Sequence, residues 1–163
     1  MDFSIKACEP SKGRKMDAAV SGDAVSVKTE CLVVGVFEQQ ALSGIAKQLD
    51  TASKGVLGRL IKRGELDGKL GSTVILHEVA GWGAARVLLV GLGPESDLNA
   101  KVFTEATRAA VRALLTTRAT DALWSLTVMP VKERDAAWAV RHTVVALRDA
   151  TYRFTRMKSK EEA

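Results

Sequence analysis

The stretch Arg86-Val87-Leu88-Leu89-Val90-Gly91-Leu92-Gly93-Pro94 decides the fold class. Its apolar run is too short for a helix and ends at glycines, which is typical of a strand. A strand with one buried face alternates apolar and polar residues, so this unbroken run predicts a central strand covered on both faces. The glycines permit a sharp turn, and Pro94 cannot continue a ladder of hydrogen bonds.

The neighbouring segments predict the rest of the sheet. Residues 73–79 form an apolar segment, and Gly81-Trp82-Gly83 separates it from the central run, so the two are expected to pair as an antiparallel hairpin. Residues 31–37 form a second unbroken apolar run and predict a buried strand with parallel neighbours. Further strands are predicted at residues 3–7, with one buried face, at the short edge segment 24–27, and at 123–129.

Helical periodicity appears between the strands. Apolar residues recur at helical spacing in four segments, each with one inward stripe. The predicted inward residues are Leu42, Ile45, Ala46 and Leu49; Val56, Leu57, Leu60 and Ile61, ending at Gly64; Phe103, Ala106, Ala110 and Leu114 in a helix over 99–117; and Ala137, Val140, Val144 and Leu147 in a helix that begins near Glu133. On the outer side of the third helix, Glu105 and Arg108 are close enough to pair. Strands interspersed with helices predict an α/β domain with a mixed, mostly parallel sheet and helices on both faces, a three-layer α/β/α fold.

Length and composition predict one domain. The chain has 163 residues, 47% of them hydrophobic and 26% charged, with a net charge of +5. We expect the domain to span 1–150, with a mobile loop over 10–30, and the charged segment 151–163 to begin a linker without a closing element. No apolar stretch is long enough to cross a bilayer, and no secretory signal is visible, so we predict a cytoplasmic protein without a membrane partner. Cys8 and Cys31 are expected to be reduced thiols in strands.

The search for chemistry yields few candidates. His77 and His142 lack metal-ligand spacing, and we interpret His77 as a partly buried residue and His142 as a surface residue. Neither a nucleophile elbow nor a Gly-Lys-Ser/Thr phosphate loop is present. Gly91 and Gly93 form either a structural turn or an anion-binding loop, since backbone amides at a strand end attract phosphate. The sequence therefore predicts no catalytic residue, no metal site and no cofactor site in this chain.

Basic residues give one further candidate. Arg134, Arg141 and Arg148 recur at heptad spacing and are compatible with a phosphate backbone, a solvated helix face, or a face covered by a following domain. The three tryptophans are not spaced as a base-stacking platform, so packing is the expected role of Trp82, Trp124 and Trp138.

The succession of motifs resembles a known family. Glu30-Cys31-Leu32-Val33-Val34-Gly35-Val36, Leu49-Asp50, Gly64-Glu65-Leu66-Asp67-Gly68-Lys69-Leu70-Gly71, the segment 86–93, and Tyr152-Arg153-Phe154 with Lys158-Ser159 occur in the order found in the N-terminal domain of the leucyl (cytosol) aminopeptidases. The resemblance covers nearly the whole chain and is weakest over residues 10–27.

The resemblance implies a macro-domain-like fold joined to a C-terminal peptidase domain. In that family the peptidase domain binds two divalent metals, zinc or manganese, through an Asn-Thr-Asp-Ala-Glu-Gly-Arg signature that this chain lacks. No catalytic residue can be carried over. The resemblance implies that the domain supports a hexamer of two trimers and shapes access to the active sites. Two alternatives stay open: a DNA-binding accessory domain, and a macro-like module for ADP-ribose or another phosphate ligand.

Overall fold

The decisive apolar run lies in strand β4 (Arg86–Gly91), where Val87, Leu88, Leu89 and Val90 are all fully buried. The computed structural model describes residues 4–7, 28–38, 42 and 44–161. Within them, β4 belongs to a five-stranded sheet of order β1-β5-β2-β4-β3. The other strands are β1 (Ser4–Ala7), β2 (Cys31–Val36), β3 (Thr73–His77) and β5 (Asp121–Trp124).

Pairing in the sheet follows the predicted pattern. Strand β2 is parallel to both β4 and β5, and β1 is parallel to β5. Only β3 runs antiparallel, beside β4 at the edge, so the hairpin is confirmed. The sheet of the described residues is therefore mixed and mostly parallel.

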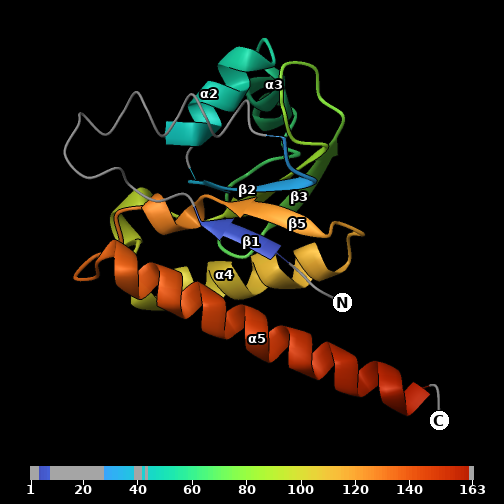
Figure 1. Ribbon diagram of the computed structural model, residues 1–163. Coiled ribbons are helices and arrows are strands. Elements are labelled where there is room, and N and C mark those ends of the chain that lie inside the picture. Colours follow the sequence, from blue (N-terminus) through green and yellow to red (C-terminus); the bar gives the residue numbers. More distant parts are fainter. Residues whose placement is uncertain (1–3, 8–27, 39–41, 43, 162–163) are drawn as a thin grey trace.

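Helices cover both faces of the sheet (Figure 1). On one side lie α2 (Gly44–Ala52) and α3 (Val56–Lys62), and on the other α4 (Ala100–Leu115) and α5 (Ala136–Glu161). Single 3-10 turns, η1 (Glu95–Asp97) and η2 (Leu126–Val128), follow β4 and β5. The predicted three-layer α/β/α architecture is confirmed.

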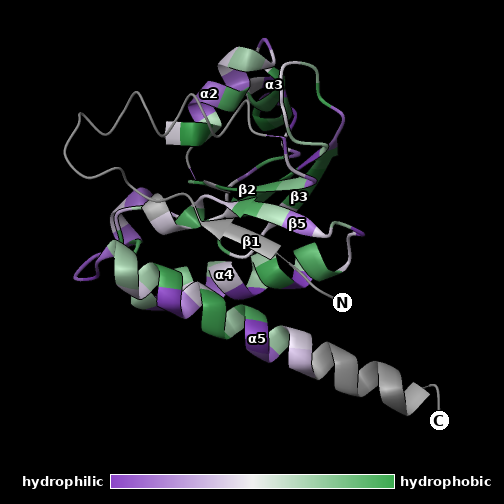
Figure 2. Ribbon diagram, in the orientation of Figure 1, coloured by the Kyte–Doolittle hydropathy of each residue, from purple (hydrophilic) through white to green (hydrophobic). Residues whose placement is uncertain are grey.

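Strand periodicity divides the apolar side chains between two cores. Val33 and Leu88 face α4 and α5, whereas Leu32 and Leu89 face α2 and α3. Successive side chains of a strand point to opposite faces, which is why the apolar runs are unbroken. Figure 2 shows β2 coloured hydrophobic, while hydrophilic residues gather on loops and on the outer sides of the helices.

Two predicted elements differ from the structure. The strand predicted at 123–129 ends at Trp124, and the residues after it turn into η2. Helix α5 begins at Ala136, not near Glu133, and it continues to Glu161, so the segment expected to lack a closing element is helical over 151–161.

The inward face predicted for the last helix was also wrong in part. Leu147 is buried, but Val144 is 48% exposed and Ala137 is exposed as well. The buried positions are instead Ala139, Thr143 and Leu147.

Several side-chain predictions have clear outcomes. The inward stripe of α4 is confirmed, since Phe103, Ala106, Ala110 and Leu114 are buried. Among the described residues the ion pair is Lys69–Asp67, so Glu105 and Arg108 do not pair. His77 is exposed rather than partly buried, and His142 is half-buried rather than a surface residue.

Some predictions fall outside the described residues. These are the edge strand at 24–27, the thiol of Cys8 and most of the loop over 10–30. The side chains of 4–7 are likewise not described. Within the described part, no helix is long and apolar enough to span a bilayer.

Candidate functional site

The predicted glycine loop lies at the carboxyl end of β4, where its amides are already hydrogen-bonded. The Gly91 N–H donates to the Ser72 carbonyl at 2.8 Å, and the Gly93 N–H donates to the Gly68 carbonyl at 2.9 Å. Between them, the Leu92 N–H donates to a β2 carbonyl at 2.9 Å. An anion-binding nest needs several amides that point at one ligand, and these three point at protein carbonyls. This hydrogen bonding favours the structural-turn interpretation.

The segment 66–71 explains why the glycines are needed. It lies across the carboxyl ends of β2 and β4, so close that a Cβ on Gly91 would be 1.9 Å from the Lys69 carbonyl oxygen. A Cβ on Gly68 would be 2.3 Å from the Phe37 carbonyl oxygen. The backbone N–H of Lys69 donates to Asp67 and, with its ammonium 3.6 Å away, holds the pKa of that carboxyl below its usual value. The segment therefore covers the carboxyl ends of β2 and β4, which are part of the edge at which open α/β sheets bind ligands.

A basic depression lies at the start of α4. It has a volume of about 680 Å³, and its lining includes three exposed basic residues, Lys101, Lys132 and Arg134. An exposed carboxylate, Glu133, also lines it. Asn99 caps the helix by accepting the Val102 N–H at 3.1 Å. The two lysines were not predicted, because their proximity depends on the Lys132 N–H donating to the Leu98 carbonyl, a contact that no spacing in the sequence shows.

Arg134 contacts a stack of aromatic rings and lies apart from the other two predicted arginines, Arg141 and Arg148. Its guanidinium lies 5.4 Å from the centre of the Trp138 ring, which stacks on His142 at 4.9 Å and 10°. Phe103 of α4 lies 5.5 Å from Trp138. Burial lowers the pKa of His142, and the nearby Arg108 lowers it further. The Nε2 atom of His142 is buried without a hydrogen-bond partner among the described residues.

Arg141 and Arg148 lie two turns apart on the exposed side of α5. Between them Val144 is 48% exposed and Val145 is 55% exposed. The three predicted arginines thus do not form one continuous basic stripe. Arg134 lines the depression at α4, while Arg141 and Arg148 flank an apolar patch.

A second depression, of about 890 Å³, lies at the amino-terminal ends of the strands. Its carboxylates are engaged with the backbone: Asp121 accepts the Glu30 N–H at 2.9 Å, and Glu30 accepts the Thr120 N–H at 2.5 Å. Trp82 donates its indole N–H to the Leu49 carbonyl. These hydrogen bonds join the amino-terminal ends of β2 and β5. The carboxylates that line this depression therefore have a structural role.

The described residues do not fit a metal centre. No group of three or more His, Cys, Asp or Glu side chains among them could hold an ion. Cys31 lies in β2 and is a free cysteine, as predicted. Burial raises the pKa of its thiol to about 11, so the thiol stays protonated near neutral pH. The tryptophans pack, as expected: Trp124 is fully buried and Trp82 and Trp138 partly so.

Comparison with known proteins decides the family. Residues 33–161 match the family described as "Cytosol aminopeptidase family, N-terminal domain". The chain belongs to the cytosol aminopeptidase family. It corresponds to the N-terminal domain of that family, as the resemblance predicted.

Relatives within the cytosol aminopeptidase family are much longer. The chain is 53% identical over 162 residues to a probable cytosol aminopeptidase of Paraburkholderia phymatum and 51% identical to one of Burkholderia ambifaria. Each match covers 99% of this chain but 31% of the relative. The chain therefore spans about a third of the length of these aminopeptidases.

Solved structures support the fold. The macrodomain of Mycobacterium tuberculosis DarG matches with a TM-score of 0.62 and 16% identity, covering 80% of this chain and 88% of that one. A mutant of tomato leucine aminopeptidase matches with a TM-score of 0.57 and 20% identity, covering 89% of this chain and 28% of that one. At these identities the likeness shows a shared fold and no more.

Proposed function

We propose that this chain is the non-catalytic N-terminal domain of a cytoplasmic, metal-dependent leucyl aminopeptidase that removes N-terminal amino acids from peptides. The observation that carries the proposal is coverage: nearly all of this chain aligns with about a third of each aminopeptidase relative. The relatives' names support the cytosolic setting.

Catalysis then belongs to the part of the relatives that this chain does not match. We expect two divalent metals, zinc or manganese, in a C-terminal catalytic domain that is the first partner of this domain. The described residues of this chain offer no fitting ligand set, so no catalytic step is assigned to them. Its own role is architectural, in supporting a hexamer and shaping access to the active sites.

The test compares the chain with a fusion. One protein is residues 1–163, and the other replaces the matching N-terminal third of the Paraburkholderia phymatum relative with this chain. With manganese or zinc added, we expect the fusion to release leucine from leucine amide and to assemble into a hexamer, and residues 1–163 to release none. Activity that follows residues 1–163 through successive purification steps would refute the proposal, as would a folded fusion that neither assembles nor hydrolyses.

A second candidate function, DNA binding, is supported by the basic depression at α4. Three cations, of Lys101, Lys132 and Arg134, surround one hollow and outnumber its single carboxylate, Glu133. We expect binding to duplex DNA to weaken steeply between low and moderate salt, because phosphate contacts release counterions. Lys132→Ala should reduce the salt slope by about one, whereas Lys47→Ala on α2 should not change it. Absence of binding even at low salt would remove this candidate.

A further inference from the structure

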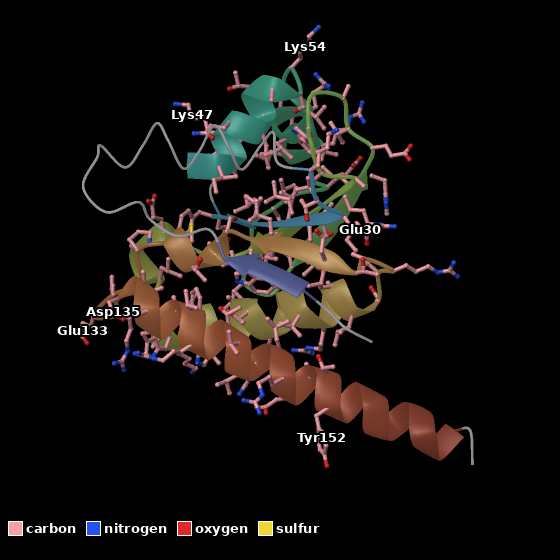
Figure 3. All side chains as sticks on the ribbon, viewed as in Figure 1. Glu30, Lys47, Lys54, Glu133, Asp135 and Tyr152 are labelled. Atoms are coloured by element: carbon pink, nitrogen blue, oxygen red, sulfur yellow. The ribbon has the colours of Figure 1, made fainter. Side chains whose placement is uncertain are left out.

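The outer face of α5 is exposed and partly apolar, whereas most large hydrophobic side chains elsewhere in the described residues are buried. Three of the four large hydrophobic residues that are exposed in the described chain lie on it: Val144, Val145 and Tyr152, the last with 64% of its surface exposed. Figure 3 shows Tyr152 pointing away from the sheet, on the side of the molecule opposite Lys47 of α2. Exposed apolar groups gathered on one helix mark an interaction site more often than isolated ones do.

We propose that this face binds a second copy of the same chain, with the two α5 helices antiparallel around a two-fold axis at Val145. The proposal deepens the assembly role given above and rests on it only in that respect. A second copy is the expected partner because this face of α5 is complementary to itself.

The self-complementarity comes from helix geometry. Residues advance about 100° and 1.5 Å each, so Arg141 and Asp149 project within about 40° of Val145, about 6 Å to either side of it. In an antiparallel pair centred on Val145, each Arg141 lies opposite Asp149 of the other copy. Both side chains are exposed and neither has an ion-pair partner among the described residues.

Two aromatic residues are also related by the two-fold axis at Val145. Trp138 and Tyr152 lie seven residues on either side of Val145 and project within about 20° of it. Trp138 already contacts Phe103 and His142 in its own domain but is only partly buried, so the part that stays exposed lies opposite Tyr152 of the other copy. One axis thus pairs valine with valine, arginine with aspartate, and tryptophan with tyrosine. Tyrosine, tryptophan and arginine are the residues that contribute most at protein interfaces.

Arg148 is also compatible with this pairing. Arg148 would lie opposite His142 of the other copy, and burial lowers the pKa of that histidine, so the ring is uncharged near neutral pH. A contact in which each copy uses the same patch is the commonest kind of dimer interface. The antiparallel arrangement also directs the two C-terminal ends of α5 away from each other, which leaves room for whatever follows residue 161 in longer relatives.

DNA fits this face less well. Phosphate contacts need a surface of one charge, and here Asp149 adjoins Arg148 while two exposed valines separate the arginines. The interpretation of Arg141 and Arg148 as a nucleic-acid stripe therefore has less support than a protein contact.

The test is a charge exchange in residues 1–163, with the dimer measured by sedimentation over a hundredfold range of concentration. We expect a monomer–dimer equilibrium. Arg141→Asp and Asp149→Arg should each weaken the dimer roughly tenfold, because each change sets like charges against each other at two symmetric places. The double variant should restore the dimer, and Val145→Asp should abolish it.

Matched controls separate these effects from net charge. Lys47→Asp and Glu65→Arg make the same charge changes on the opposite side of the sheet and should leave the dimer unchanged. Circular dichroism checks that each variant keeps its helix content. A monomer at every concentration would overturn the proposal. So would a dimer that persists in Val145→Asp, or a double variant no stronger than the single ones. The assay involves no peptidase chemistry, so its failure is distinguishable from failure of the proposed function.

Discussion

Among the glycines of the described residues, Gly91 has the closest approach to neighbouring backbone. A Cβ there would lie 1.9 Å from the Lys69 carbonyl oxygen and 2.4 Å from the Ser72 hydroxyl oxygen. Because the first of these atoms is backbone, relief requires the segment 66–71 to move. We expect Gly91→Ala to lower the free energy of unfolding by roughly 2–3 kcal/mol, measured by urea denaturation.

Gly58 supplies the matched control. It lies inside α3, and a Cβ there would meet the Asp50 carboxylate at an ordinary 3.6 Å. Gly58→Ala should therefore stabilise the domain by about 0.5–1 kcal/mol, because alanine favours the helix. Equal effects of the two changes would contradict the close approach at Gly91.

His142 gives the domain a dependence on pH. Burial, and then Arg108, lower its folded pKa from the usual 6.5, so below pH 6.5 the unfolded chain binds a proton that the folded chain resists. Stability is thus complete above about pH 6.5 and declines as the pH falls toward the lowered pKa. We expect the free energy of unfolding to fall more steeply between pH 7 and 5 in the unmodified chain than in His142→Gln. His77→Gln, which changes an exposed histidine, should keep the full slope; a His142→Gln slope as steep as the original would disprove this origin.

At the scale of elements, two side chains start the helices of one layer. Asn99 accepts the Val102 N–H at the start of α4, and Asp135 accepts the Trp138 N–H at 2.7 Å before α5. Each satisfies a backbone donor that the helix itself cannot. We expect Asn99→Ala and Asp135→Ala each to lower stability by about 1 kcal/mol in chemical denaturation. The side chains of Asn99→Asp and Asp135→Asn can still accept the backbone N–H, so the stability of these variants should stay within about 0.5 kcal/mol of the unmodified chain. A loss of stability as large as that of the alanine variants would argue against capping.

Elements with a single consistent hydrophobic periodicity were predictable from the sequence. Strand β4 and helix α4 each have one consistent periodicity, and both lie where predicted. The end of β5 was not predictable, because it depends on a residue distant in sequence. The hydroxyl and the N–H of Ser125 both donate to the Val33 carbonyl, at 2.5 and 3.1 Å, and the chain then turns into η2.

The prediction of which face of α5 points inward failed for a different reason. Valines occur on both its sides, so hydrophobicity alone does not choose the inner face. Thr143 can be buried without cost to its hydroxyl, because the hydroxyl donates to the Ala139 carbonyl at 2.8 Å within the helix. With Ala139, Thr143 and Leu147 facing inward, Val144 lies on the outer side of the helix. Val144, which was predicted to face inward, thus belongs to the exposed outer face of α5.

At the scale of the whole molecule, the layers resemble a macrodomain, but the carboxyl edge of the sheet is covered at β2 and β4. The carboxyl ends of β2 and β4 meet the segment 66–71, and Gly68 supplies the positive φ of 70° that its close approach requires. The candidate loop was predictable only in part. Its glycines follow from their motif, whereas the carbonyls of Ser72 and Gly68, which accept the Gly91 and Gly93 N–H groups, are brought to them only by the fold.

This arrangement makes a prediction about ADP-ribose, the remaining alternative function. The amides of Gly91, Leu92 and Gly93 donate to protein carbonyls, so a diphosphate would have to displace three backbone hydrogen bonds to use them. We expect calorimetric titration of ADP-ribose into residues 1–163 to give no heat beyond dilution, while an ADP-ribose-binding macro domain in the same buffer gives a saturable signal. Saturable one-to-one binding by this chain would contradict the prediction, and it would mean that the segment 66–71 leaves the edge of the sheet when a ligand arrives.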